Sequence, residues 1–324
     1  MPEMPRRDLG LAAAAAATAA ALPAAGQTGP APAPRQPAEF LRFRTEDGVG
    51  LNALLWTPPG RAAGAAAAPA RSAVVLVPGF NGSILGGAHD YQPLAEALSA
   101  RGHALLLPAM RTASDFTDPR FEDCEQDIAA VLSAARARGV EQVALFGTSL
   151  GGPRVTWFLA QRPAPEVRAM GYVASIMSPY EEAQLRFGDG DRARLDAFLA
   201  RCRALAAEGR AEEPVRFADW FPRRHVLMTA RGFLNVFGAP SDTVLSSHRH
   251  GAAVRVPALV VHGTADEIAL RPNAEAIHAS LVNAPRRDLV WVEGASHYLT
   301  PGWIAQRYAE VVADWVARTM PAGA

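Results

Sequence analysis

Short apolar runs alternate with longer amphipathic stretches over most of the chain. The apolar runs, which resemble strands buried on both faces, are at residues 73–78, 103–107, 143–147, 169–176, 256–262 and 288–292. The stretches with apolar residues at helical spacing are at residues 90–101, 121–138, 153–161, 272–281 and 304–318. This alternation predicts an α/β fold whose mostly parallel sheet is flanked by helices. Right-handed crossovers then bring the carboxyl ends of the strands to one edge, where ligands bind.

Two segments depart from this alternation. Residues 40–44 and 50–57 flank a turn at Glu46-Asp47-Gly48, which predicts an antiparallel hairpin at a sheet edge. Residues 179–255 lose the strand pattern: apolar positions in 191–208 recur at helical spacing, and the later part is rich in aromatic residues. These aromatic residues are Trp220, Phe221, Phe233 and Phe237. We therefore expect a helical insertion at 179–255 between two parts of one core, 39–178 and 256–320.

The N-terminal segment has a different composition. Arg6-Arg7 precede an apolar stretch at 9–22, which ends at Pro23 and a few small residues. This order is typical of an export signal of the twin-arginine kind over residues 1–26, followed by a Pro- and Ala-rich linker at 27–38. The protein is then expected to be periplasmic or secreted; if the segment is only an Ala-rich disordered tail, it is cytoplasmic. Nowhere later does the sequence contain an apolar run long enough to predict a membrane span.

Charge and cysteine content limit the possible partners. The formal net charge is zero and the isoelectric point is about 7.1, so no global field favours nucleic acid or an anionic membrane. Cys124 and Cys202 fall in different predicted helices, and we expect free thiols, with a disulfide left open for an oxidising compartment. His248 and His250 form an H-x-H pair without neighbouring cysteines or a carboxylate cluster, so no metal site is expected. The sequence leaves the oligomeric state open.

The sequence Gly147-Thr148-Ser149-Leu150-Gly151 joins a predicted strand to a predicted helix. A serine at such a turn must adopt a strained conformation, which the two glycines permit. The pattern is that of the nucleophile elbow, G-x-S-x-G, and the chain resembles an α/β-hydrolase from about residue 40 to residue 318. The resemblance implies that residues 179–255 are a cap over an active site, although their aromatic residues could simply pack the cap to the core.

Two later loops resemble the other catalytic loops of this family. His262-Gly263-Thr264-Ala265-Asp266 resembles H-G-x-x-D, whose aspartate is the acid, and residues 294–297 resemble G-x-x-H, which presents the imidazole. The resemblance implies the family order of serine, acid and histidine, with Ser149 as nucleophile, His297 as base and Asp266 as acid.

Each assignment has an alternative. Asp266 could be a capping or ion-paired loop carboxylate, in which case Glu267 or Glu181 is the substitute acid. His297 could be a surface histidine. His262, at the end of a buried strand, is expected to be a hydrogen-bonded packing residue.

The resemblance also implies two backbone donors for the oxyanion, the N–H groups of Leu150 and Phe80. Two positions depart from the family pattern. Pro78 replaces the usual histidine before Gly79, and Arg111 lacks the frequent aspartate two residues earlier. A backbone N–H does not depend on the first replacement, so Phe80 remains the expected donor.

We interpret the chain as a serine hydrolase that cleaves small or medium carboxylic esters through an acyl-enzyme and requires no cofactor. Its expected partner is a small-molecule ester. An aminopeptidase or amidase of the same fold is an alternative, because the same three residues cleave amides and no anchor for a substrate amine is evident. A non-catalytic binding protein on this scaffold is a third possibility.

Overall fold

The computed structural model describes residues 36–59, 70–80, 82–83, 91–220, 224–299 and 302–322. The expected export signal, most of the expected linker and Phe221 lie outside these ranges. The described ranges belong to one compact unit that begins at Gln36. No helix within them is both long and apolar enough to cross a membrane.

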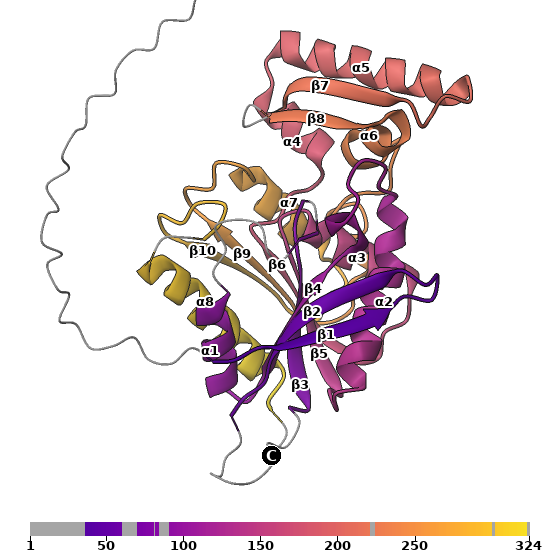
Figure 1. Ribbon diagram of the computed structural model, residues 1–324. Coiled ribbons are helices and arrows are strands. Elements are labelled where there is room, and N and C mark those ends of the chain that lie inside the picture. Colours follow the sequence, from indigo (N-terminus) through magenta and orange to yellow (C-terminus); the bar gives the residue numbers. More distant parts are fainter. Residues whose placement is uncertain are drawn as a thin grey trace, which may run out of the picture. The chain divides into compact units, whose positions relative to one another are not determined.

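A mostly parallel sheet forms the centre of this unit (Figure 1). In the described part of the chain its strand order is β1-β2-β4-β3-β5-β6-β9-β10. The strands are β1 Glu39–Arg44, β2 Gly50–Trp56, β3 Ser72–Val77, β4 Ala104–Ala109, β5 Gln142–Thr148, β6 Val167–Val173, β9 Ala258–Gly263 and β10 Arg287–Val292. β1 pairs with β2 and β2 with β4 in antiparallel fashion, and the other neighbours are parallel. The predicted parallel sheet with an antiparallel hairpin at one edge is therefore confirmed.

Helices cover both faces of the sheet. One face packs against α1 and α8, and the other against α2, α3 and α7 (Figure 1). The bounds are α1 Gln92–Ala100, α2 Cys124–Arg136, α3 Gly151–Gln161, α7 Arg271–Ser280 and α8 Trp303–Thr319. Because side chains alternate along a strand, β3 sends Val74 and Leu76 to the first face and Val75 and Val77 to the second. Burial on both faces explains the uninterrupted apolar sequence of this strand.

The insertion between β6 and β9 is not wholly helical, so that part of the prediction is wrong. Its elements are α4 Pro179–Arg186, α5 Asp189–Ala207, β7 Pro214–Trp220, β8 Arg224–Thr229 and α6 Ala230–Phe237. The described residues also form three short 3-10 helices, of which η1 Arg111–Ala113 and η2 Phe121–Asp123 lie between β4 and α2, and η3 Gly251–Ala253 lies just before β9. β7 and β8 pair antiparallel. Val215 and Phe217 on β7, with Val226 and Met228 on β8, are buried, which is the two-residue period of a strand.

Aromatic side chains make up the interior of this cap. The cluster consists of Phe198, Phe217, Trp220, Phe233 and Phe237. Its ring centroids lie 4.6 to 6.5 Å apart. Most of these rings therefore pack against one another within the cap, and Phe237 also lies 6.1 Å from the ring of Phe80 in the core.

The two cysteines are unpaired. Cys124 begins α2, Cys202 lies in α5, and both are buried free thiols. Burial raises the pKa of both, that of Cys202 to about 11. The expected free thiols are confirmed.

Candidate active site

Ser149 lies at a strained turn between β5 and α3. Its φ is 52°, in the left-handed region that a residue with a side chain rarely adopts. A Cβ at Gly147 would lie 2.3 Å from the carbonyl carbon of Gly151, and one at Gly151 would lie 2.2 Å from the carbonyl oxygen of Val77. The Ser149 N–H donates to Val173 on β6 at 2.9 Å, which fixes the turn to the sheet. Both glycines are thus required by close backbone packing.

Three side chains from separate loops meet beside this turn. His297 Nε2 lies 3.0 Å from Ser149 Oγ, and His297 Nδ1 lies 3.0 Å from each carboxylate oxygen of Asp266. The loops follow β5, β9 and β10, so they leave the same edge of the parallel sheet. His297 is 6% and Asp266 9% exposed, so the contact between them is shielded from water, whereas the contact of His297 with Ser149 is only partly buried. The structure therefore brings together the three residues that the sequence assigned to one site.

Asp266 is held in place by its own loop. The backbone N–H groups of Ile268 and Ala269 donate to Oδ1 at 2.9 and 2.7 Å. Such bonds fix the orientation of the carboxylate toward the imidazole.

His262 is fully buried behind Asp266. Its Nε2 donates to the carbonyl of Ala269 at 2.7 Å and lies 3.5 Å from Asp266 Oδ2. Burial lowers the pKa of this ring, which favours its neutral form. His262 is thus a hydrogen-bonded packing residue that also borders the acid.

The two alternative acids bond elsewhere. The carboxylate of Glu267 accepts from the backbone N–H of His297 at 3.2 Å, not from the ring. Glu181 accepts from Ser178 Oγ at 2.7 Å and lies 3.4 Å from His248 Nε2. The geometry therefore favours Asp266 over both.

The expected oxyanion donors border the serine. A Cβ at Gly79 would lie 2.9 Å from Ser149 Cβ and 3.4 Å from its Oγ, so the 78–80 loop touches the nucleophile turn. In the described part of the chain, neither the Phe80 nor the Leu150 backbone N–H has a hydrogen-bond partner. Two donors thus remain available for an anionic oxygen.

Two residues that no sequence motif identified, Arg154 and Ser175, support these loops. Arg154, on α3, is only 3% exposed and donates to the carbonyl oxygens of Pro78, Gly79 and Phe80. Ser175 Oγ donates to the carbonyl of Ser149 at 2.9 Å. An arginine inside an otherwise apolar helix was the available signal for the first. Ser175 had none.

The cap is bonded to the loop that carries the acid. Arg186, at the end of α4, donates to the carbonyls of Glu267 and Ile268, and to Glu182 Oε1 at 2.6 Å. Glu182 is fully buried and also accepts from the Asn273 amide on α7. Burial raises the pKa of the Glu182 carboxyl. α4 therefore helps to set the position of residues 266–268.

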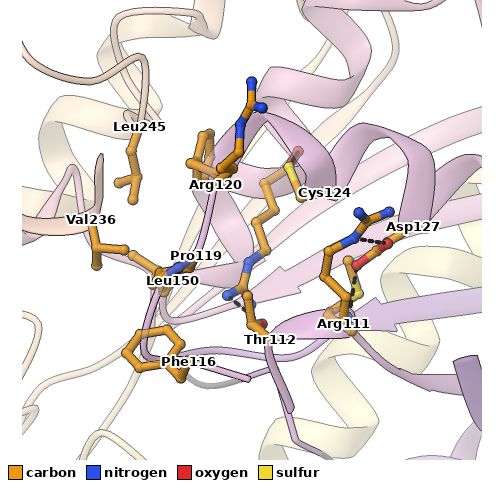
Figure 2. A pocket seen from close by; sticks show the side chains of 13 residues that line it. Arg111, Thr112, Phe116, Pro119, Arg120, Cys124, Asp127, Leu150, Val236 and Leu245 are labelled. Carbon is orange, nitrogen blue, oxygen red and sulfur yellow. Dashed lines mark hydrogen bonds and ion pairs between the residues drawn. The ribbon is translucent and has the colours of Figure 1, made fainter. Parts of the chain in front are cut away.

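A cavity of about 20 Å³, roughly the size of one water molecule, lies between the nucleophile turn and the cap (Figure 2). Leu150 lines it together with Val236 and Leu245 from the insertion. On the opposite side in Figure 2, Arg111 is hydrogen-bonded to Asp127 at 2.7 Å. Among the described residues, no three His, Cys, Asp or Glu side chains come close enough to hold a metal ion. The three loops at the site present a hydroxyl, an imidazole and a carboxylate.

A sequence model of the alpha/beta hydrolase family matches residues 74–315, which is more than half of the chain. No curated protein matches the chain.

Solved structures with the same fold include enzymes with several activities. The esterase domain of a Rhodothermus marinus protein is 17% identical, with a TM-score of 0.55, 87% of this chain covered and 98% of that one. Est1E from Butyrivibrio proteoclasticus is 18% identical, with a TM-score of 0.56 and coverage of 87% and 98%. An acylaminoacyl peptidase of Pyrococcus horikoshii is 13% identical, with a TM-score of 0.61 and coverage of 89% and 42%. At identities this low, the structural matches show a common fold but not a common activity.

Proposed function

The chain belongs to the alpha/beta hydrolase family, and on this basis we propose that it is a serine hydrolase that cleaves carboxylic esters through an acyl-enzyme. The observation that carries the proposal is the hydrogen-bonded series Ser149, His297, Asp266, with both contacts at 3.0 Å. A serine hydroxyl becomes an effective nucleophile when a base accepts its proton and a third group orients that base.

In the proposed mechanism, Ser149 Oγ attacks the ester carbonyl carbon while His297 Nε2 takes its proton. Asp266 stabilises the imidazolium at Nδ1, and the N–H groups of Leu150 and Phe80 donate to the oxyanion. The tetrahedral intermediate expels the alcohol, which receives the proton from His297. Water then attacks the acyl-enzyme by the same route, releasing the carboxylic acid and restoring the free serine.

The site supports an ester substrate better than a free amino-terminal peptide. An aminopeptidase requires an anion that binds the substrate ammonium group. Among the described residues, the carboxylates of Glu181, Glu182 and Glu267 all bond to groups of the protein itself. Solved structures of the same fold include both esterases and a peptidase, so cleavage of amides is the second candidate.

Labelling with a fluorophosphonate tests the nucleophile. We expect a single adduct on Ser149, located by mass mapping, and none in Ser149→Ala. The variant should fold normally and lose turnover by about 10⁴-fold or more. Absence of the adduct from the folded wild-type protein would favour a binding protein.

Paired substrates test the bond that is cleaved. Rates on a series of p-nitrophenyl esters are compared with rates on aminoacyl-nitroanilides, with Ser149→Ala as the background control. We expect ester hydrolysis to dominate. Faster cleavage of the anilides would replace the esterase assignment by the peptidase one.

A further inference from the structure

A buried cation lies beneath the loop that is expected to bind the oxyanion. Arg154 Nη1 donates to the carbonyls of Pro78 and Gly79, each at 2.7 Å, and its Nη2 donates to the carbonyl of Phe80 at 3.0 Å. A longer contact of 3.4 Å joins Nη2 to Thr112 Oγ1. One guanidinium thus binds three successive carbonyl groups.

These contacts are not those of an ordinary ion pair. Arg154 is only 3% exposed, and it forms no salt bridge within the described ranges. Burial lowers the pKa of its guanidinium. Asp127 is close enough to interact with this charge electrostatically, but it bonds directly to Arg111. Because a buried charge is costly, the carbonyls that solvate the guanidinium must be held in a definite arrangement around it.

The planarity of the peptide bond connects these carbonyls to the oxyanion donor. The C=O of Gly79 and the N–H of Phe80 belong to the same peptide unit, and in a trans peptide they point in opposite directions. Binding the Gly79 oxygen to Arg154 therefore fixes the direction of the Phe80 N–H, which has no partner of its own among the described residues. The Gly82 N–H donates to the same oxygen at 2.9 Å and reinforces this orientation.

The cation also changes the electrostatics of the loop. A positive charge bonded to a carbonyl polarises the peptide group and strengthens its N–H as a donor, more so where water is excluded. The loop touches Ser149 at Gly79, so this effect is exerted beside the nucleophile.

We propose that Arg154 is a positioning residue that holds the 78–80 loop so that the Phe80 N–H stabilises the oxyanion formed at Ser149. The inference rests on the proposed serine hydrolase function and adds to it a residue that does not touch the substrate. It requires that loss of Arg154 weakens transition-state binding far more than substrate binding.

The test compares Arg154→Met, which removes the charge and keeps the length of the side chain, with Arg154→Lys, which keeps the charge but not the fork of donors. Arg101→Met is the control. Arg101 donates to the Ala97 carbonyl and to Asp314, joins α1 to α8, and contacts no residue of the three catalytic loops in the described chain. Active-site titration with a fluorophosphonate counts the competent molecules in each preparation, so rates are expressed per folded site.

We expect Arg154→Met to lower kcat by about 10- to 100-fold while KM changes by less than about 3-fold, since removal of an entire oxyanion donor costs about 10²- to 10³-fold. Arg154→Lys should recover part of this loss. Inhibition by a trifluoromethyl ketone, which adds Ser149 to form an oxyanion, should weaken by the same factor as kcat/KM. Inhibition by the matching methyl ketone should remain unchanged, and Arg101→Met should alter neither constant.

Several outcomes would overturn the inference. Wild-type kcat in Arg154→Met, or equal weakening of both ketones, would show that Arg154 does not orient the oxyanion donor. Failure of both variants to fold would make Arg154 a structural requirement only. An inactive, unlabelled wild-type protein would instead refute the proposed function, so the two failures can be distinguished.

Discussion

Substitution of Asp266 by asparagine should abolish most turnover while leaving the fold intact. Two backbone N–H groups donate to Oδ1, at 2.9 and 2.7 Å, so the asparagine must place its amide oxygen there. The amide nitrogen then occupies the Oδ2 position, 3.0 Å from His297 Nδ1. An NH₂ group at that position donates to Nδ1 and favours the imidazole with its proton on Nε2, in competition with Oδ1, which accepts from the other tautomer at the same distance of 3.0 Å. His297 would then donate to Ser149 and could no longer act as its base.

The expected size of the effect follows from this change of tautomer. In serine proteases the same substitution lowers kcat by about 10⁴-fold. Since each tenfold step is about 1.4 kcal/mol, this corresponds to about 5 kcal/mol of lost transition-state stabilisation. Asp266→Asn retains both backbone hydrogen bonds, so its thermal unfolding should remain cooperative and close to that of the wild type.

The assay is steady-state hydrolysis of a p-nitrophenyl ester, with Glu267→Gln as the matched control. Glu267 is the adjacent carboxylate, and it bonds to the backbone of His297 at 3.2 Å, so its neutralisation should cost less than about tenfold. If Asp266→Asn keeps more than a tenth of wild-type kcat, or if Glu267→Gln loses as much, then Asp266 is not the group that orients the imidazole.

Three further predictions concern other parts of the molecule. Gly151→Ala should prevent correct folding of the nucleophile turn, because its Cβ would lie 2.2 Å from a carbonyl oxygen of β3. Gly190→Ala meets no atom within 4 Å and lies in the first turn of α5, so it should leave the stability unchanged or raise it by less than about 1 kcal/mol. Burial lowers the pKa of His103 below its ordinary 6.5, so the unfolded chain binds a proton first and the free energy of unfolding should decrease as the pH falls below about 6.5. Cys124 and Cys202 should react with a thiol reagent only after denaturation.

Activity and thermal unfolding check the glycine pair, and equal behaviour of the two variants would contradict the packing argument. Urea titrations at pH 7.5 and 5.5 check the histidine, with His103→Asn as the comparison. An unchanged pH dependence in that variant would exclude His103 as its source. Rapid reaction of either thiol in the native protein would contradict its burial.

The core could be predicted from the sequence because its strands are uninterrupted apolar runs and its helices carry apolar residues at clear helical spacing. β3 and β5 are apolar at nearly every position, since the sheet is covered on both faces, and their length distinguishes them from helices. The active-site loops were found because each follows such a strand. Ser149, Asp266 and His297 depend on short local motifs at strand ends, and the order of the strands then brings them together.

The cap and the support of the oxyanion loop could not be predicted in the same way. The alternation in β7 and β8 spans few residues, and the apolar residues at helical spacing in 191–208 led to the prediction of a helix for the whole insertion. Arg154 binds carbonyls that are 74 to 76 residues earlier in the chain. Since every residue carries a carbonyl, no residue type in the sequence identifies the partners of this arginine. Such contacts depend on tertiary structure alone.

The bonds from Arg186 and Glu182 bear on the use of this scaffold in enzyme engineering. Exchange of caps between hydrolases is a route to altered substrate preference when the cap can be moved as a separate module. Here α4, the first helix of the insertion, also stabilises the segment that carries Asp266, because Arg186 bonds to the carbonyl of Ile268 and to Glu182. A chimaera whose junction precedes residue 179 would lose the bonds of α4 to this segment together with the native cap. A junction after residue 186 would preserve them. The useful boundary for recombination is therefore one helix later than the boundary of the insertion.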